Sequence, residues 1–174
     1  MYIIPEPQQM ELSGGDYTIR FDQKIVIDAS CTAQAYGYAQ LLQEELRGCM
    51  GYGPAITRGR SGKAAVTLAA DPALGEEEYR LTVDADGIRI TGGADRGLLY
   101  GVQTLRQIVR QTGACVPCLH IHDFPDIKNR GFYHDVTRGR VPTLSYLKGL
   151  ADNLAFIRST SCSYILSIPI CSRI

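Results

Sequence analysis

The stretch that decides the fold runs Tyr79-Arg-Leu-Thr-Val-Asp-Ala-Asp-Gly-Ile-Arg-Ile-Thr-Gly-Gly-Ala-Asp-Arg-Gly-Leu-Leu-Tyr-Gly-Val-Gln-Thr-Leu-Arg-Gln107. Apolar and polar residues alternate on both sides of Asp86-Gly87, and this dipeptide is a strong hairpin-turn signal. We therefore predict two antiparallel strands over residues 78–83 and 88–91. After residue 94 the apolar spacing changes to that of a helix.

That helix is expected over residues 95–110. Its apolar residues form one buried stripe, made of Leu98, Val102, Leu105 and Val109. Gly97 and Gly101 lie one turn apart in it, where a glycine costs about 1 kcal/mol relative to alanine. We expect them to allow close approach to a sheet. A phosphate-binding loop at residues 92–97 is the alternative, but a hairpin precedes it and G-x-x-x-x-G-K-[ST] is absent.

Upstream segments add further strands and a second helix. Short strands are predicted over residues 17–21 and 24–28, a buried strand over 64–70, and a helix over 33–46 that ends among glycines. Residues 1–122 therefore predict an α+β domain: a mainly antiparallel sheet with two helices on one face.

The pattern changes after this domain. Residues 121–127 contain a proline and predict a linker, and residues 129–136 predict a strand. Thr143 is a good N-cap for a helix that extends to about residue 156. One face of this helix carries Leu144, Leu147, Leu150, Ala151 and Leu154. A strand, a loop and a helix make one β/α unit, which begins a (β/α) barrel and leaves it incomplete.

Composition excludes several classes of protein. The chain has 174 residues, 45% of them hydrophobic and 21% charged, and its formal net charge is zero. A neutral chain gives no electrostatic support for a nucleic-acid partner or an anionic membrane surface. The N-terminus has no basic region followed by an apolar run, so no signal peptide is expected and a cytoplasmic location is the default. Nor does any run approach the roughly 18 apolar residues of a membrane span.

The cysteines and histidines give no metal or cofactor prediction. Cys115-Val-Pro-Cys118 is a lone C-x-x-C with no second pair nearby, and it runs into a strand-like segment rather than a helix. His120 and His122 share one face of that segment but have no obvious third ligand. We interpret these side chains as structural or incidental, and expect no cofactor.

The residues of two motifs resemble glycoside hydrolase family 20, the β-N-acetylhexosaminidases. The small domain that precedes the barrel in this family carries a motif that matches Gly97, Gly101, Thr104, Leu105 and Gln107. The family's barrel opens with a pattern that matches Asp123, Pro125, Arg130, Gly131, Asp135, Thr137, Arg138 and Pro142. The resemblance covers roughly residues 3–156 and implies the family's N-terminal α/β domain over 1–122 and the first β/α unit over 123–156.

The resemblance also implies a function for the parent enzyme. Its members remove terminal N-acetylhexosamine from glycans by a retaining mechanism in which the substrate's acetamido group is the nucleophile, assisted by an Asp-Glu pair in a motif like H-x-G-G-D-E. That motif is absent here, so we assign no catalytic residue and predict a non-catalytic fragment. Arg130 matches an arginine that binds sugar hydroxyls in the family. A structural alternative for Arg130, pairing with Asp126 or Asp135, is favoured in this chain.

The last eighteen residues depart from the family. The family continues much like Tyr-Lys-Ile-Asn-Gln-Leu-Gln-Leu-Tyr, whereas residues 157–174 show neither helical nor strand periodicity. Back-translated with permitted codons, beginning ATA AGA TCA ACC AGC TGC, and preceded by one added T, they read Tyr-Lys-Ile-Asn-Gln-Leu-Gln-Leu-Tyr-Leu-Glu-His-Thr-Tyr-Leu-Phe-Pro-Asp. We infer a single-base deletion near codon 157, which leaves Cys162 and Cys171 without a designed role.

Two further expectations concern partners. A stand-alone carbohydrate-binding or interaction module is the competing class of function, although the chain has no tryptophan to stack on sugars. The orphaned β/α unit would expose an apolar stripe and open strand edges. It would then pack back on its own domain, associate as a homodimer or be disordered, and the homodimer is the favoured outcome.

Overall fold

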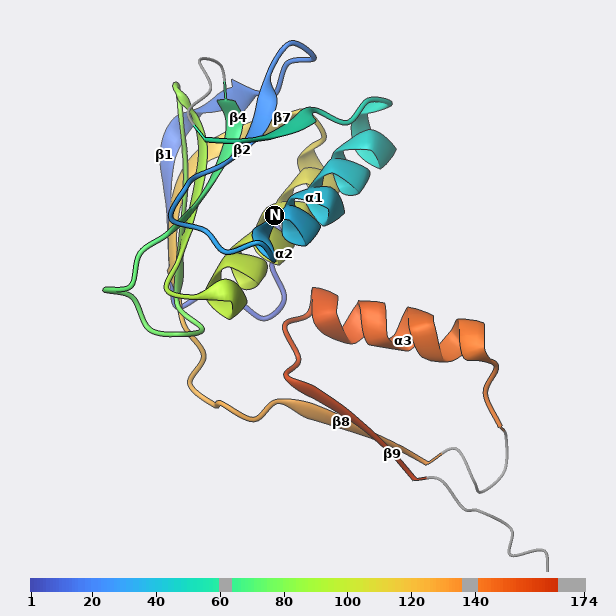
Figure 1. The fold of residues 1–174 in the computed structure, drawn as a ribbon. Helices are drawn as coiled ribbons and strands as arrows, with labels where there is room; N and C mark the ends of the chain where they lie inside the picture. Colours follow the sequence, from blue (N-terminus) through green and yellow to red (C-terminus); the bar gives the residue numbers. More distant parts are fainter. Residues whose placement is uncertain (60–63, 136–140, 166–174) are drawn as a thin grey trace, which may run out of the picture. The chain divides into compact units, whose positions relative to one another are not determined.

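A computed structural model describes residues 1–59, 64–135 and 141–165. The chain forms two compact units, Met1–Pro125 and a second that begins at Asp126. Figure 1 shows both units.

The first unit contains a seven-stranded sheet in the order β1-β7-β5-β6-β4-β2-β3. Antiparallel pairing joins β1, β7, β5 and β6, and parallel pairing adds β4, β2 and β3 beyond β6. The strands are β1 (Gln9–Thr18), β2 (Lys24–Ile27), β3 (Ala55–Arg58), β4 (Ala64–Ala70), β5 (Tyr79–Asp84), β6 (Gly87–Gly92) and β7 (Cys115–Asp123). The α+β class and the mainly antiparallel sheet are confirmed, while the parallel end was not anticipated.

The hairpin and the helix of the opening stretch are where the sequence places them. β5 and β6 pair with Asp84 opposite Gly87, and α2 spans Asp95–Thr112. The strand expected over residues 64–70 is β4. The expected strand over residues 17–21 is wrong, because β1 begins at Gln9 and ends at Thr18. Nearly all of β1 is exposed at the sheet edge, and its apolar alternation is limited to Met10 and Leu12 before Gly14 and Gly15 interrupt it.

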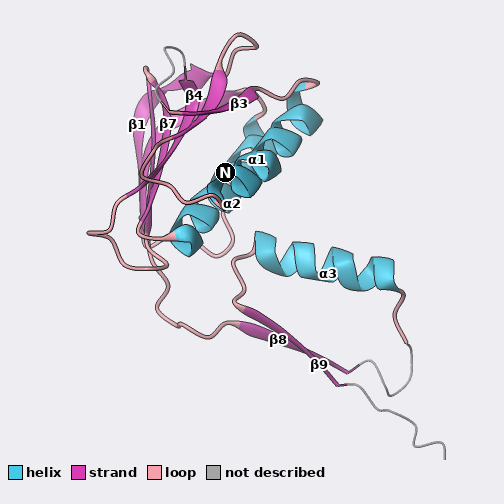
Figure 2. Cartoon of the chain, in the orientation of Figure 1, coloured by secondary structure: helices cyan, strands magenta, loops and turns pink. Residues whose placement is uncertain are grey.

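Both helices pack on one face of the sheet, as Figure 2 shows. α1 spans Ala35–Met50 and extends past the expected end, with Gly48 inside it. It stops at Gly51, whose left-handed φ of 79° suits a helix C-cap. The core lies between the helices and the sheet, and its largest fully buried side chains include Tyr79, Ile25, Leu42, Leu46, Leu68, Leu81, Ile90, Leu98, Leu105 and Ile108.

The two glycines of α2 allow close approach to the sheet, as expected. A Cβ on Gly101 would lie 2.4 Å from Ile90 Cγ2, and one on Gly97 would lie 2.2 Å from the carbonyl oxygen of Glu78. The neighbouring Gly93 is equally restricted, since its Cβ would lie 1.9 Å from the carbonyl oxygen of Gly75. Backbone packing thus accounts for the glycine cluster that superficially suits a phosphate loop.

Substituting these glycines provides a test of that packing. We expect Gly97→Ala to lower the free energy of unfolding by about 1–3 kcal/mol, because backbone must move to admit the methyl group. Gly48→Ala is the matched control, since a Cβ there meets nothing within 4 Å. It should raise stability by about 0.5–1 kcal/mol. Urea unfolding of both variants measures the change in the free energy of unfolding. A change of the same sign in both variants would contradict the close packing of Gly97 against the backbone.

The second unit contains β8 (Gly131–Asp135), α3 (Leu144–Phe156) and β9 (Ser161–Ile165). β8 and β9 pair in parallel, so α3 lies on the crossover between them in the chain. Thr143 caps α3 as expected, because its hydroxyl accepts a hydrogen bond from the Tyr146 amide at 3.2 Å. The bounds of α3 expected from the sequence are confirmed.

Two expectations for this region need correction. The linker begins later than predicted, because residues 121–123 continue β7 as it pairs with β5. A strand, β9, also lies in the segment where no periodicity predicts one. Its pairing with β8 uses backbone groups, which an open strand edge offers to any extended segment. The predicted strand residue Val136 lies outside the described residues.

Candidate functional site

Arg130, the one substrate-binding candidate, lies just before β8 and is half-buried. Its guanidinium donates hydrogen bonds to two backbone carbonyls, from Nε to Arg158 at 3.1 Å and from Nη1 to Ile127. A guanidinium used in this way holds a loop together. Binding the vicinal hydroxyls of a sugar would require the same planar set of donors.

The backbone of Arg130 is held by the loop that follows α3. Its amide donates to Thr160 Oγ1 at 2.8 Å, and its carbonyl accepts from Ser159 Oγ at 2.6 Å and from the Thr160 amide at 2.7 Å. All of these partners lie within residues 157–174, for which a shifted reading frame is inferred. The Arg158 carbonyl also lies in this segment, whereas the Ile127 carbonyl does not.

The end of α3 places an arginine where glycine is preferred. The Arg158 amide donates to the Ala155 carbonyl at 3.0 Å and the Ser159 amide to the Leu154 carbonyl at 2.9 Å, which is the Schellman pattern of helix ends. Arg158 has a left-handed φ of 61° and is only 4% exposed. This combination is uncommon, since the left-handed conformation is unfavourable for a residue with a Cβ.

Of the other residues of the barrel-opening pattern, Asp123 has a structural role. Asp123 ends β7, is buried, and accepts a hydrogen bond from the Gln8 amide at 3.1 Å. A Cβ on Gly131 would lie 2.4 Å from Ser161 Oγ, so a larger residue there requires this hydroxyl to rotate away. Asp135 is the last residue of β8. Thr137 and Arg138 lie outside the described residues.

The helix motif is also explained by packing. The Thr104 and Tyr79 hydroxyls are 2.7 Å apart in the core between α2 and β5. Gln107 bonds to both backbone groups of Ile4, accepting from the amide at 2.7 Å and donating to the carbonyl at 2.8 Å. Together with the two close-packed glycines, these contacts assign a structural role to each polar member of the motif.

The cysteines and histidines of β7 do not converge on a site. Cys115 and Cys118 both lie within the strand, and the five described cysteines are free thiols. His122 Nε2 lies 2.6 Å from Glu78 Oε1. The pKa of Glu78 is lowered, first by the Gly75 amide that donates to it and then by His122. Within residues 1–59, 64–135 and 141–165, no group of three or more His, Cys, Asp or Glu side chains is arranged to hold a metal.

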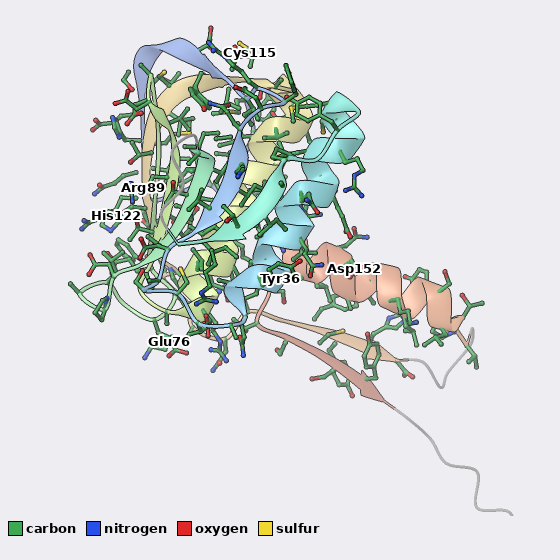
Figure 3. All side chains as sticks on the ribbon, turned by 45° about the horizontal axis from the view of Figure 1, so that its top comes forward. Tyr36, Glu76, Arg89, Cys115, His122 and Asp152 are labelled. Carbon is green, nitrogen blue, oxygen red and sulfur yellow. The ribbon has the colours of Figure 1, made fainter. Side chains whose placement is uncertain are left out.

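The sheet face opposite the helices is polar. Figure 3 shows Arg89 and His122 on that side. In the strand register Arg80 lies opposite His122, and Thr82 lies opposite Arg89 on one side and His120 on the other. Such a face is typical of the solvated side of an antiparallel sheet. In the described part of the chain, no helix is both long and apolar enough to cross a bilayer.

One ionic cluster escaped the sequence analysis. Glu45 of α1 accepts from Arg110 of α2 through both carboxylate oxygens, at 2.6 and 2.9 Å, and from Arg106 at 3.0 and 3.1 Å. Gln103 in turn accepts from Arg106 at 2.7 Å. The cluster joins the two helices and is structural. No sequence signal could have found it, because its partners lie some 60 residues apart on different helices.

Comparison with known proteins settles the family. The family described as "Glycosyl hydrolase family 20, domain 2" matches residues 1–124. The chain belongs to glycosyl hydrolase family 20. Curated relatives include a β-hexosaminidase of Vibrio furnissii, 31% identical over 155 residues, which cover 88% of this chain and 24% of that protein. A β-N-acetylhexosaminidase of Cellulomonas fimi is 31% identical over 78% of this chain and 28% of its own length.

Solved structures of the family have the same fold. The Streptomyces plicatus N-acetyl-β-hexosaminidase in complex with Thio-NAglucal superposes with a TM-score of 0.83 at 26% identity, over 95% of this chain and 34% of that one. A D313N mutant of the Streptomyces plicatus enzyme is bound to the product GlcNAc, with a TM-score of 0.82. The chain thus corresponds to about a quarter of the length of its first curated relatives.

Proposed function

We propose that this chain provides the support domain and the first β/α unit of a β-N-acetylhexosaminidase and does not itself catalyse hydrolysis. The observation that carries the proposal is the family match over residues 1–124. The hydrogen bonds of Thr104, Gln107 and Asp123 support it, since these polar motif residues all hold the domain together. In this proposal the domain stabilises the enzyme and leaves the chemistry to the barrel.

The proposed reaction of the enzyme is removal of a terminal N-acetylhexosamine from a glycan. Relatives named β-hexosaminidase, and a family structure bound to GlcNAc, support this substrate class. In the substrate-assisted mechanism one carboxylate orients the acetamido group and another protonates the leaving oxygen. The H-x-G-G-D-E motif that resembles this pair in the family does not occur in the sequence.

Arg130 is proposed to bind sugar hydroxyls only in the setting of the intact barrel. A guanidinium fork can donate to two adjacent hydroxyls at once. In this chain its Nε and Nη1 donate to the carbonyls of Arg158 and Ile127. Titration with N-acetylglucosamine should therefore produce no saturable heat, and saturable binding abolished by Arg130→Ala would instead favour a stand-alone carbohydrate-binding module.

The pure chain is expected to hydrolyse a chromogenic N-acetylglucosaminide no faster than the buffer does. Losing both carboxylates of such a mechanism removes both the acid and the group that orients the nucleophile. The Vibrio furnissii β-hexosaminidase, assayed in parallel, is the positive control. Turnover by this chain that disappears on substitution of one of its own residues would overturn the non-catalytic assignment.

We further propose that the second unit associates as a homodimer. None of the residues of α3 is buried, and Leu144 is 69% and Tyr146 55% exposed. Tyr133 of β8 is 65% exposed, and within the described residues β8 and β9 form a two-stranded sheet. Exposed apolar side chains and open strand edges both drive association.

Light scattering tests the dimer. The full chain is expected to have about twice the mass of a monomer. A version that ends at Pro125 is expected to have the mass of a monomer, because the association surface lies beyond this residue. The shorter version is the matched control, since residues 1–125 form a compact unit. If both are monomeric and equally soluble, the exposed surface does not drive association.

The shifted reading frame from codon 157 stays a proposal. The family-like peptide recovered by one added base supports it, and so does the buried, left-handed Arg158, an unfavourable choice at a helix end. Sequencing the gene across codon 157 decides between the two frames. An uninterrupted original frame that encodes residues 157–174 in closely related genes would refute the deletion.

A further inference from the structure

Two glutamine side chains of α2 form hydrogen bonds to the backbone of the N-terminal segment. Gln111 of α2 accepts from the Tyr2 amide at 2.8 Å and donates to the Tyr2 carbonyl at 2.6 Å. Gln107, one turn earlier, makes the same two bonds to Ile4, at 2.7 and 2.8 Å. Each carboxamide thus satisfies one residue's donor and acceptor together, as a neighbouring strand would.

The spacing of the two glutamines matches that of an extended peptide. Residues four apart in a helix are separated by about 6.0 Å along its axis. In an extended chain, the amide and carbonyl groups that face one side recur every second residue, about 6.6 Å apart. Gln111 and Gln107 therefore bond to Tyr2 and Ile4 at a spacing that matches alternate residues of an extended segment.

The residue between Tyr2 and Ile4 supplies an apolar anchor. Ile3 is 9% exposed and joins the core cluster, whereas Tyr2 is 83% and Ile4 61% exposed. Hydrogen bonds to the backbone do not depend on the identity of the side chains. Selectivity comes instead from a pocket for every second side chain. The arrangement selects an extended segment with an aliphatic residue at its centre.

We propose that this face of α2, with Gln107, Gln111 and the core residues against which Ile3 packs, is a binding site for an extended aliphatic peptide. In this chain residues 2–4 occupy the site. Asp123 of β7 extends the hold, since it accepts the Gln8 amide where the same segment leaves for β1. Two glutamine side chains and the burial of Ile3 hold the occupant, so an equivalent peptide added in trans is expected to replace it.

The test uses a chain that begins at Pro7 and a synthetic peptide of residues 1–6. The peptide, titrated to about 5 mM because such short segments bind weakly, is expected to raise the Tm of the shortened chain saturably. A peptide N-methylated at the Ile4 nitrogen loses the amide that Gln107 accepts and should give no shift. The shortened chain with Gln107→Ala and Gln111→Ala should also fail to respond to the unmodified peptide.

A second measurement covers the case in which the shortened chain does not fold. In the full chain, Gln107→Ala should increase the hydrogen-exchange rate of the Ile4 amide at least about tenfold, as expected for a lost bond worth roughly 1.4 kcal/mol. Gln103→Ala, on the same helix but bonded to Arg106, is the control and should leave that rate unchanged. An equal shift from the methylated peptide, or unchanged exchange of Ile4 in Gln107→Ala, would overturn the proposal.

Discussion

Leu105→Ala is expected to lower the free energy of unfolding by about 2–5 kcal/mol. Leu105 lies in the middle of α2, is fully buried, and belongs to the core cluster between helix and sheet. The loss combines the transfer free energy of the deleted atoms with the cavity they leave. The upper part of this range is expected, because the close-packed Gly97 and Gly101 prevent α2 from moving further into the sheet.

Chemical denaturation monitored by circular dichroism measures the effect. Leu99→Ala is the matched control. Leu99 is the leucine that precedes Leu105 in α2, and it is only partly buried against the core. Leu99→Ala should lower the free energy of unfolding clearly less than Leu105→Ala does. Equal losses, or a loss at Leu105 within experimental error, would contradict the assignment of this stripe as the buried face.

Glu45→Ala is expected to have the second largest effect, about 2–3 kcal/mol. Removing one member of a buried ion pair leaves the partner charge uncompensated, and this costs about 3–5 kcal/mol in fully buried pairs. Here the Glu45 side chain is 9% and that of Arg106 16% exposed, but that of Arg110 is 50% exposed. Solvent therefore screens part of the loss.

The exposed neighbour Glu44 provides the control for Glu45. Glu44→Ala removes the same charge from the same turn of α1, so both variants change net charge and helix propensity alike. Only Glu45→Ala should shift the denaturation midpoint substantially. A similar small shift in both variants would show that the ionic cluster between α1 and α2 contributes little.

The sequence predicted most of the antiparallel part of the fold because the signals there are local. Asp86-Gly87 fixes a hairpin within one turn, and the leucine stripe of α2 repeats within one helix. Thr143 marks a helix start by its own hydroxyl. Each of these features depends on residues within a few positions of one another, so their pattern is visible without the tertiary structure.

The missed features depend on residues that are far apart in the chain. β1 is exposed and has little apolar alternation, and β3 is a four-residue edge strand. The Glu45 cluster joins helices that meet only after folding. For the candidate site, the family pattern picked out Arg130, but only the structure identifies the carbonyls of Ile127 and Arg158 as its partners.

The pairing of β1 with β7 sets the order of events during synthesis. Gln9 lies opposite His122, so β1 can pair only after β7, the last strand of its unit, has been synthesised. Closing so long a loop is slow compared with forming the β5–β6 hairpin or the helices. Residues 9–18 therefore stay without this partner until the rest of the first unit has been synthesised, and co-translational folding of that unit completes only when β7 emerges.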